Sequence, residues 1–361
     1  MSLTQMLYNA PLYQPVKFPP PKSNVIILCS NDDIKYIPEV FKEYNIKLVI
    51  SDKPSSEKII LDNDAIQVDY DLQKIFNYQN CHIIIFSHRW DYDILLRFSR
   101  RLFKLNIRYK YICMPVDGRY QPCHPNFFID SRDELEKIFN LLCDDESREI
   151  FVSRIKSIIM GTIGYIRQSE YDDYFHPETI PHKGDIVIDG GVGPYIHLVK
   201  KYSKHVGNNG HVYCFEPACY FDVLDKFTDI NNATLFQHGL WNKLEDQIFK
   251  VSGLGSHVVN EHSDSTITSK MTTIDAFMSE CNINKVDIIK LDVEGSEKNV
   301  LLGGIDTIIK HRPKLLICVY HKLNDLFELP LFIHELDLNY KFYLGHHRPI
   351  LMDTVLYAVP N

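Results

Sequence analysis

The first half of the chain alternates short apolar runs with segments of helical spacing. The apolar runs are rich in Val, Ile and Leu and predict strands at residues 25–29, 47–50, 66–68, 82–86 and 109–114. Apolar positions three and four residues apart predict helices at residues 34–44 and 91–105. Strands that alternate with helices of this length indicate a parallel, doubly wound sheet.

The same alternation restarts in the second half of the chain. Apolar runs predict strands at residues 186–188, 211–215, 234–238, 286–291, 314–319, 340–344 and 354–358. Helical segments are predicted at residues 195–204, 219–229, 272–281 and 297–302. The polar, Ser- and Thr-rich stretch at residues 244–269 predicts one or two short hairpins.

We therefore expect an α/β protein with two doubly wound, Rossmann-like domains. The expected order is an extended arm at residues 1–23, a first domain at 24–142, a helical linker at 143–180 and a second domain at 181–361. The first domain lacks a glycine turn after its first strand. Residues 30–33, with two acids, stand there instead. We expect no nucleotide to bind this domain.

A glycine turn follows the first strand of the second domain. Asp189 ends the strand, and Gly190, Gly191 and Gly193 come within the next four residues. Such a turn lets a ligand contact bare backbone at a helix N-terminus. The GxGxxG dinucleotide fingerprint is incomplete, because Ile196 stands where its last glycine should be.

The acid at this strand end favours a cationic ligand. Asp189 would repel a pyrophosphate, but it suits an ammonium group, and S-adenosylmethionine carries both an ammonium and a sulfonium. Tyr195, at the predicted helix start, is a further candidate for this end of the ligand. The alternative is a structural turn in which Asp189 caps the helix.

Four strand ends of the second domain carry polar residues: Asp189, Glu216, Asp292 and His321. Ends of parallel strands meet at the carboxyl edge of a sheet, where ligands bind. Glu216 follows Gly190 by 26 residues, and with Pro217 it ends the second strand. An acid at that place can accept hydrogen bonds from both ribose hydroxyls of an adenosine ligand. A solvated loop acid is the alternative.

Leu240 and Trp241 follow the third strand of this domain. They are candidates for apolar cover over an adenine ring, and core packing explains them equally well.

Lys290, Asp292 and Glu294 alternate at the end of an apolar strand. Three charges on one side of a buried strand are costly unless they are paired or catalytic. Asp292 or His321 is the candidate general base, and Lys290 would orient a carboxylate or a forming alkoxide. A structural ion pair between Lys290 and Asp292 is the alternative.

His321, His346 and His347 raise the question of a metal site with Asp292. Their separations along the chain are long and irregular, which favours a hydrogen-bonded histidine cluster over metal ligation. We therefore predict no metal.

Composition narrows the functional classes. The net charge of −8 over 361 residues gives no general attraction to nucleic acid. No apolar run approaches the roughly 20 residues that span a bilayer. The nine cysteines form no CxxC pair, which indicates a reducing compartment. We expect a cytoplasmic protein whose partner is a small molecule or glycan, and a homo-oligomer stays open.

The second half of the chain resembles the FkbM-type family of S-adenosylmethionine-dependent methyltransferases. The resemblance rests on Asp189-Gly190-Gly191-Val192-Gly193, on Phe215-Glu216-Pro217, on residues 289–297 with Asp-Val-Glu-Gly-Ser-Glu, on residues 300–304, on Arg312-Pro313, on Tyr320-His321 and on residues 354–358. Two departures are Gly191, where the family more often has alanine, and Pro194.

This resemblance implies a class I methyltransferase sheet whose last strand is antiparallel. It also implies O-methylation of a hydroxyl on a sugar, a glycan or a secondary metabolite. Asp189 and the glycines would then hold the methionine end of the donor, Glu216 its ribose, and Asp292 and His321 the acceptor.

Two other functions stay open at this point. One is an NAD-dependent sugar oxidoreductase or epimerase, against which the broken fingerprint and the absence of a Tyr-x-x-x-Lys pair from residues 181–361 argue. The other is a non-catalytic scaffold of a glycan-building complex, which the first domain would help to assemble.

Overall fold

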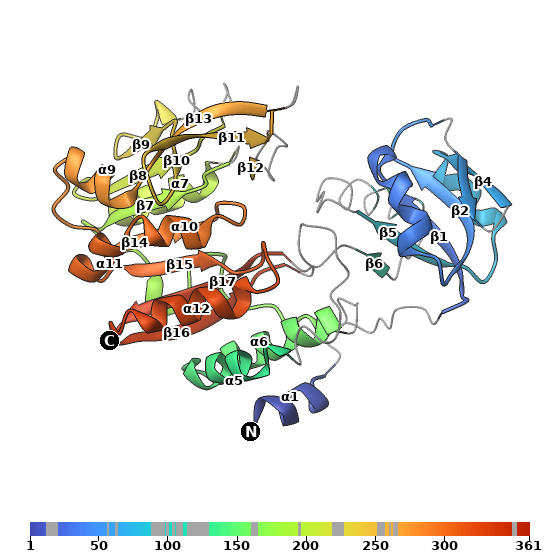
Figure 1. Cartoon of the computed structure of the whole chain (residues 1–361), viewed down its shortest axis with the longest axis horizontal. Coiled ribbons are helices and arrows are strands. Elements are labelled where there is room, and N and C mark those ends of the chain that lie inside the picture. Colours follow the sequence, from blue (N-terminus) through green and yellow to red (C-terminus); the bar gives the residue numbers. More distant parts are fainter. Residues whose placement is uncertain are drawn as a thin grey trace. The chain divides into compact units, whose positions relative to one another are not determined.

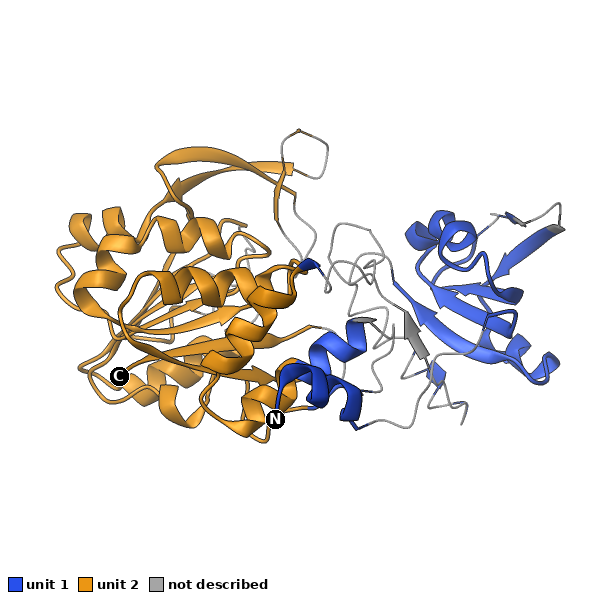
Figure 2. Ribbon diagram, turned by 60° about the horizontal axis from the view of Figure 1, so that its bottom comes forward, with its two compact units in different colours: residues 1–130, 152–167, 349–351 blue, residues 131–151, 168–348, 352–361 orange. Residues whose placement is uncertain are grey.

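A computed structural model of the 361-residue chain divides into two compact units, shown in different colours in Figure 2. Unit 1 comprises residues 1–130, 152–167 and 349–351, and unit 2 comprises residues 131–151, 168–348 and 352–361. The structure describes residues 1–11, 21–55, 58–61, 64–87, 98, 101–102, 105, 111–113, 130–159, 165–193, 196–218, 227–250, 257–259, 261–262, 266–348 and 352–361.

The described part of unit 1 contains one sheet in the order β3-β4-β2-β1-β5-β6 (Figure 1). Its strands are β1 (Asn24–Cys29), β2 (Asn45–Ser51), β3 (Lys58–Leu61), β4 (Asp64–Asp69), β5 (His82–Phe86) and β6 (Tyr111–Cys113). The neighbouring strands are parallel, as predicted, except for the antiparallel edge pair β3 and β4. The apolar pattern had not indicated β3.

Two helical predictions for unit 1 differ from the structure. Residues 34–44 do not form one helix, but a 3-10 helix, η1 (Asn31–Tyr36), and a single turn, α2 (Ile37–Val40). Pro38 lacks a backbone N–H, so the helical hydrogen bonds are interrupted there. The arm is not extended at α1 (Leu3–Asn9), because Ser2 and Gln5 form a capping box and Leu3 is buried. A further 3-10 helix, η2, spans Leu72–Asn77. Most of the helix predicted at 91–105 lies outside the described residues.

Unit 2 is built on a sheet in the order β16-β17-β15-β14-β7-β8-β9 (Figure 1). Its strands are β7 (Ile186–Gly190), β8 (His211–Phe215), β9 (Ala233–Phe236), β14 (Ile288–Leu291), β15 (Lys314–Cys318), β16 (Tyr340–His346) and β17 (Thr354–Pro360). The pairs from β9 to β15 are parallel, and β17 runs antiparallel to both of its neighbours. The strand order changes direction at β7, so its carboxyl end is the position where such sheets bind ligands.

A second, smaller sheet occupies the stretch in which hairpins were predicted. Its order is β10-β13-β11-β12, with β10 (Gly239–Leu240), β11 (Glu245–Lys250), β12 (His257–Val259) and β13 (Thr266–Thr272). β11 pairs antiparallel with both β12 and β13, which confirms the hairpin prediction. β10 pairs in parallel with β13.

Helices complete unit 2, and the pattern predicted some of them. They are α5 (Arg132–Leu141), the start of α6 (Asp145–Ile159), the 3-10 helix η4 (Pro177–Thr179), α7 (His197–Val206), α9 (Ile274–Glu280), α10 (Glu297–Leu302), α11 (Ile305–His311) and α12 (Asp325–Glu335). Thr273 caps α9, since its hydroxyl accepts the Ala276 amide at 2.9 Å. The sequence pattern missed α11 and α12. None of the described helices has the length and apolar character that crossing a membrane requires.

The segment before β7 that contains Tyr171 and Tyr174 is held against β17 by hydrogen bonds and ring contacts. The backbone amide of Tyr174 donates to the hydroxyl of Tyr357 at 3.2 Å. His347 Nε2 lies 2.9 Å from the same hydroxyl, and the Tyr171 ring packs edge-on against the rings of His347 and Tyr357. Because the Tyr357 oxygen already accepts a hydrogen bond from the Tyr174 amide, the hydroxyl can donate its own hydrogen bond to a neutral His347 imidazole.

Acidification should destabilise the protein through His347. Burial lowers the pKa of His347 to about 4, whereas an exposed imidazole titrates near about 6.5. The unfolded state therefore binds a proton at His347 at a higher pH than the folded state does. The contribution of the neutral imidazole to the free energy of unfolding is complete above about pH 6.5 and is lost as the pH falls towards about 4. Between about pH 7 and pH 5 we expect the free energy of unfolding to fall by about 2 kcal/mol more in the wild type than in His347→Gln.

Urea denaturation at both pH values measures this difference. Gln is the matched replacement, because its amide oxygen can accept the Tyr357 proton without titrating. Equal pH dependence in the two proteins would contradict the assignment of a neutral, buried imidazole.

Candidate active site

The glycine turn after β7 is pressed against the chain that leaves β14. Gly191 and Gly193 both have positive φ, +80° and +60°. A Cβ at Gly191 would lie 1.8 Å from the backbone oxygen of Asp292. The Gly191 amide also donates to the Phe215 carbonyl at 2.9 Å, which ties the turn to the end of β8. Alanine at position 191 would therefore collide with the neighbouring strand end.

A buried ion pair lies directly under this turn. Lys290 Nζ is 3.0 Å from Asp189 Oδ1, and the two side chains are 3% and 1% exposed. The same ammonium donates to the Gly191 carbonyl at 2.7 Å. Burial lowers the pKa of Lys290, but the carboxylates of Asp189 and Asp292 outweigh it and raise this pKa above its ordinary value. Lys290 is thus a permanent cation that joins β14, β7 and the turn.

Glu216 closes the other side of the turn. Its Oε2 accepts the Gly193 amide at 2.8 Å and its Oε1 accepts the Ala218 amide at 3.0 Å. The side chain is buried, and burial raises its pKa while the two amides oppose that change. Each carboxylate oxygen keeps a second lone pair for a ligand.

A cavity opens beside the turn at the carboxyl edge of the sheet. Seven of the predicted site residues line it: Gly191, Gly193, Glu216, Pro217, Leu240, Asp292 and Glu294. Its other lining residues are Val192, Phe215, Gly239, Phe249, Met271, Val293 and Ser296.

Five predicted residues, one of them His321, do not line the cavity, and one cannot be placed. Asp189, Gly190 and Lys290 lie in the strands beneath it, and Trp241 lies to one side with its backbone oxygen against Gly303. Tyr195 is outside the described residues.

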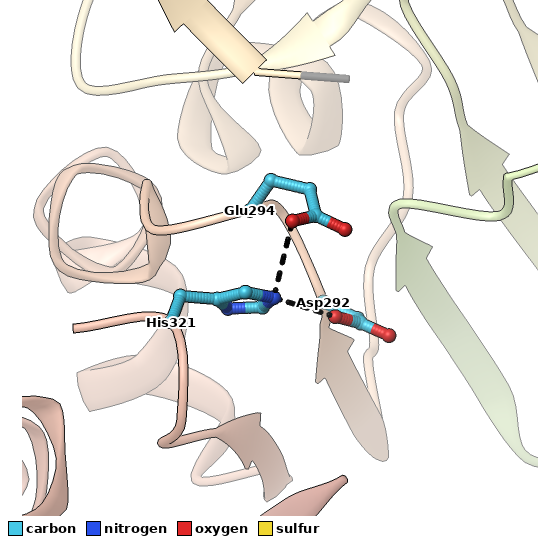
Figure 3. A group of neighbouring side chains, drawn as sticks. All are labelled: Asp292, Glu294 and His321. Atoms are coloured by element: carbon cyan, nitrogen blue, oxygen red, sulfur yellow. Dashed lines mark ion pairs between the residues drawn. The ribbon is translucent and has the colours of Figure 1, made fainter. Parts of the chain in front are cut away.

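Asp292, Glu294 and His321 meet at the edge of this cavity, as Figure 3 shows. His321 Nε2 lies 3.4 Å from Asp292 Oδ1 and 3.5 Å from Glu294 Oε2. Although β14 ends at Leu291, the turn after it brings Glu294 back beside Asp292. Glu294 has a φ of +53°, an unusual conformation for a residue with a side chain.

Neighbouring side chains set the charges of this group. Burial raises the pKa of Asp292, but Lys290 and His321 outweigh it and hold the pKa below its ordinary value. Burial raises the pKa of Glu294 to about 8. Burial lowers the pKa of His321, but Glu297 and Glu294 outweigh it and raise the pKa. Asp292 therefore keeps its negative charge beside the imidazole of His321.

Two tyrosines that the sequence reasoning missed fix the position of Asp292. Tyr174 donates to Oδ2 at 2.9 Å and Tyr320 donates to Oδ1 at 3.1 Å. Tyr320 directly precedes His321 at a strand end, which could have been a signal. Tyr174 is far away in the sequence and carried no local signal, and the same holds for Phe249 and Met271 of the small sheet.

The other two histidines considered for a metal site have different partners. His346 Nδ1 lies 2.8 Å from the Thr354 hydroxyl, and His347 contacts Tyr357. The residues that meet His321 are instead Asp292 and Glu294.

Part of the chain is similar to a known methyltransferase domain. Residues 182–344 match the sequence model of the methyltransferase FkbM domain. The fold is similar to the crystal structure of methyltransferase FkbM from Methylobacillus flagellatus KT. That match has a TM-score of 0.63 and 16% identity, and it covers 99% of this chain and 98% of that one.

A weaker structural match is fibrillarin from Aeropyrum pernix in complex with natively bound S-adenosyl-L-methionine. It has a TM-score of 0.34 and 14% identity, over 52% of this chain and 71% of that chain. No curated protein sequence matches the chain.

Gly191→Ala should destabilise the protein more than Gly184→Ala. Both glycines have positive φ, so each substitution carries a backbone cost of about 1–3 kcal/mol. A Cβ at Gly184 meets nothing within 4 Å, whereas a Cβ at Gly191 strikes the Asp292 carbonyl. Urea denaturation should therefore show the larger loss for Gly191→Ala, and equal losses would contradict the close approach.

Lys290→Met should lower the free energy of unfolding by about 3–5 kcal/mol, because it leaves a buried carboxylate without its cation. The double variant Lys290→Met/Asp189→Asn removes both charges and should recover part of that loss. Denaturant unfolding of the wild type, of Lys290→Met, of Asp189→Asn and of the double variant measures the recovery. A double variant as unstable as the sum of its two single variants would show that the pair is not coupled.

Proposed function

Because residues 182–344 form a domain of the FkbM methyltransferase family, we propose that the protein is an S-adenosylmethionine-dependent O-methyltransferase. The acceptor is a hydroxyl group on a sugar, a glycan or a secondary metabolite. One observation carries the proposal: a single cavity has the glycine turn and Glu216 on one wall and the pair Asp292 and Glu294 on another. The first wall suits the donor and the second suits the acceptor.

The donor's adenosine fits the Glu216 side of the cavity. The two free lone pairs of the Glu216 carboxylate accept hydrogen bonds from the two ribose hydroxyls. Leu240, Phe249 and Met271 give an apolar surface for the adenine ring, and the sulfur of Met271 suits an aromatic neighbour.

The methionine end of the donor lies along the glycine turn. Gly191 and Gly193 have no side chains, so the ligand reaches the backbone there. Asp189 and Lys290 act from below by holding the turn in place, since their contacts are to each other and to the Gly191 carbonyl. They are positioning residues in this proposal, and Asp292 faces the sulfonium from the cavity wall.

Methyl transfer needs an acceptor oxygen aligned with the carbon–sulfur bond and freed of its proton. Alignment supplies at most about 7–11 kcal/mol in well-oriented systems. A general base adds about two to four powers of ten. Asp292 and His321 stand where such a base is needed, and Tyr174 and Tyr320 hold Asp292 in one orientation.

Isothermal titration calorimetry with S-adenosylhomocysteine tests the proposal. We expect one binding site per chain. Glu216→Gln should weaken binding by about 10- to 100-fold, because hydrogen bonds to a charged group contribute about 1.5–3 kcal/mol. Glu280→Gln, which changes an exposed acid on α9, should bind as the wild type does.

Circular dichroism of each sample establishes that the variants are folded. Folded wild-type protein that fails to bind S-adenosylhomocysteine would refute the proposed function. Binding unaffected by Glu216→Gln would move the ribose site elsewhere.

A further inference from the structure

We propose that Asp292, Glu294 and His321 bind a divalent cation, each through one side-chain atom. The site lies where β14 and β15 end, beside the donor cavity (Figure 3). Cation binding at this site is independent of the proposed function, but a catalytic use of the cation rests on the proposed methyl transfer.

The distances between donor atoms fit a bound ion. The Nε2 atom of His321 lies 3.4 Å from Asp292 Oδ1 and 3.5 Å from Glu294 Oε2, and the three donor atoms lie within 4.8 Å of one another. Adjacent ligands of an ion with bonds of about 2.0–2.4 Å have separations of this size.

The geometry is less suited to a protonated histidine. A charged N–H donates to a carboxylate oxygen at about 2.7–2.9 Å, and neither acid comes that close to Nε2. Among the described residues, neither ring nitrogen of His321 has a partner that meets the geometry of a hydrogen bond, although the side chain is only 8% exposed. A buried ring nitrogen that lies between two carboxylate oxygens, at distances longer than a hydrogen bond to either, is the arrangement of ligands around a cation.

Glu297 prepares the imidazole for this role. Its Oε1 lies 2.9 Å from His321 Nδ1, and its side chain is 1% exposed. The same oxygen accepts the Val293 amide at 2.9 Å, which fixes the carboxylate. A carboxylate beside one ring nitrogen keeps the proton there and leaves the other nitrogen free to bind metal, which is the usual outer-shell arrangement at histidine ligands.

The two acids leave room for a substrate on the ion. Their side chains are 25% and 29% exposed, and both line the cavity. A site with three protein ligands and open positions towards a cavity is typical of catalytic rather than structural metals. Two carboxylates with one imidazole suit a first-row divalent cation such as Mn²⁺, Fe²⁺ or Zn²⁺.

The bound cation would act on the acceptor hydroxyl in place of a general base, since Asp292 and His321 then serve as its ligands. The hydroxyl oxygen takes an open position on the ion, which lowers its pKa, and its proton passes to water. The oxygen then forms a bond to the donor's methyl carbon while the carbon–sulfur bond breaks and its electron pair stays on sulfur. The products are a methyl ether, S-adenosylhomocysteine and the released proton.

Direct cation binding by the full chain tests the site. The protein is stripped with EDTA, dialysed and titrated with Mn²⁺, and the free ion is followed by electron paramagnetic resonance. We expect one equivalent bound per chain, and calorimetry with Zn²⁺ should give the same stoichiometry. Glu294→Gln and His321→Gln should each weaken binding at least tenfold, and Glu297→Gln by about 10- to 100-fold.

Glu280→Gln is the control and should bind Mn²⁺ as the wild type does. S-adenosylhomocysteine calorimetry on the same samples separates the two proposals, since a folded protein that binds the nucleoside but neither cation overturns the metal site alone. Cation binding that persists in both Glu294→Gln and His321→Gln also overturns it. Cation binding without nucleoside binding refutes the methyltransferase and leaves the metal site standing.

Discussion

The ion pair between Lys290 and Asp189 is the constraint on which the rest of unit 2 depends. The two residues face each other in register on the neighbouring strands β14 and β7, at the centre of the sheet. A buried charge is costly unless it is paired, so each side chain restricts where the other can be. The ammonium has a second acceptor in the Gly191 carbonyl, and through it the register of two strands also fixes the shape of the glycine turn.

The glycine turn also fixes the position of both walls of the cavity. Gly191 contacts the backbone of Asp292 so closely that only a hydrogen atom fits between them. Gly193 donates to Glu216, which holds the acid after β8 against the same turn. The glycine turn therefore links the wall that carries Glu216 to the wall that carries Asp292, through one hydrogen bond from its backbone and one close backbone contact. A geometry of this kind is organised before the ligand arrives, which lowers the cost of binding.

Local patterns predicted most strands of the two larger sheets and the residues at their ends. Runs such as residues 186–190 and 288–291 are short, apolar and bounded by polar residues, and this signal needs no tertiary information. The parts that could not be predicted depend on distant contacts. Tyr174 reaches Asp292 across 118 residues, and Phe249 and Met271 reach the cavity only because the small sheet folds beside it. Glu294 was expected to follow strand alternation, but its place beside His321 comes from a left-handed turn. The interior Pro330 of α12 shows the reverse case, since tertiary packing keeps a helix that the sequence pattern argues against.

Asp292 and Glu294 lie beyond the end of β14. Asp292 accepts hydrogen bonds from Tyr174 and Tyr320, and apolar residues of similar size in these places would give a sheet of similar stability. A concentration of carboxylates there opposes folding, so its use must lie in binding positive charge. In the proposed reaction the donor arrives as a sulfonium and leaves as a neutral thioether. The part of the attraction that depends on the sulfonium charge is therefore present before methyl transfer and absent after it, so the carboxylates hold the product less tightly than the donor.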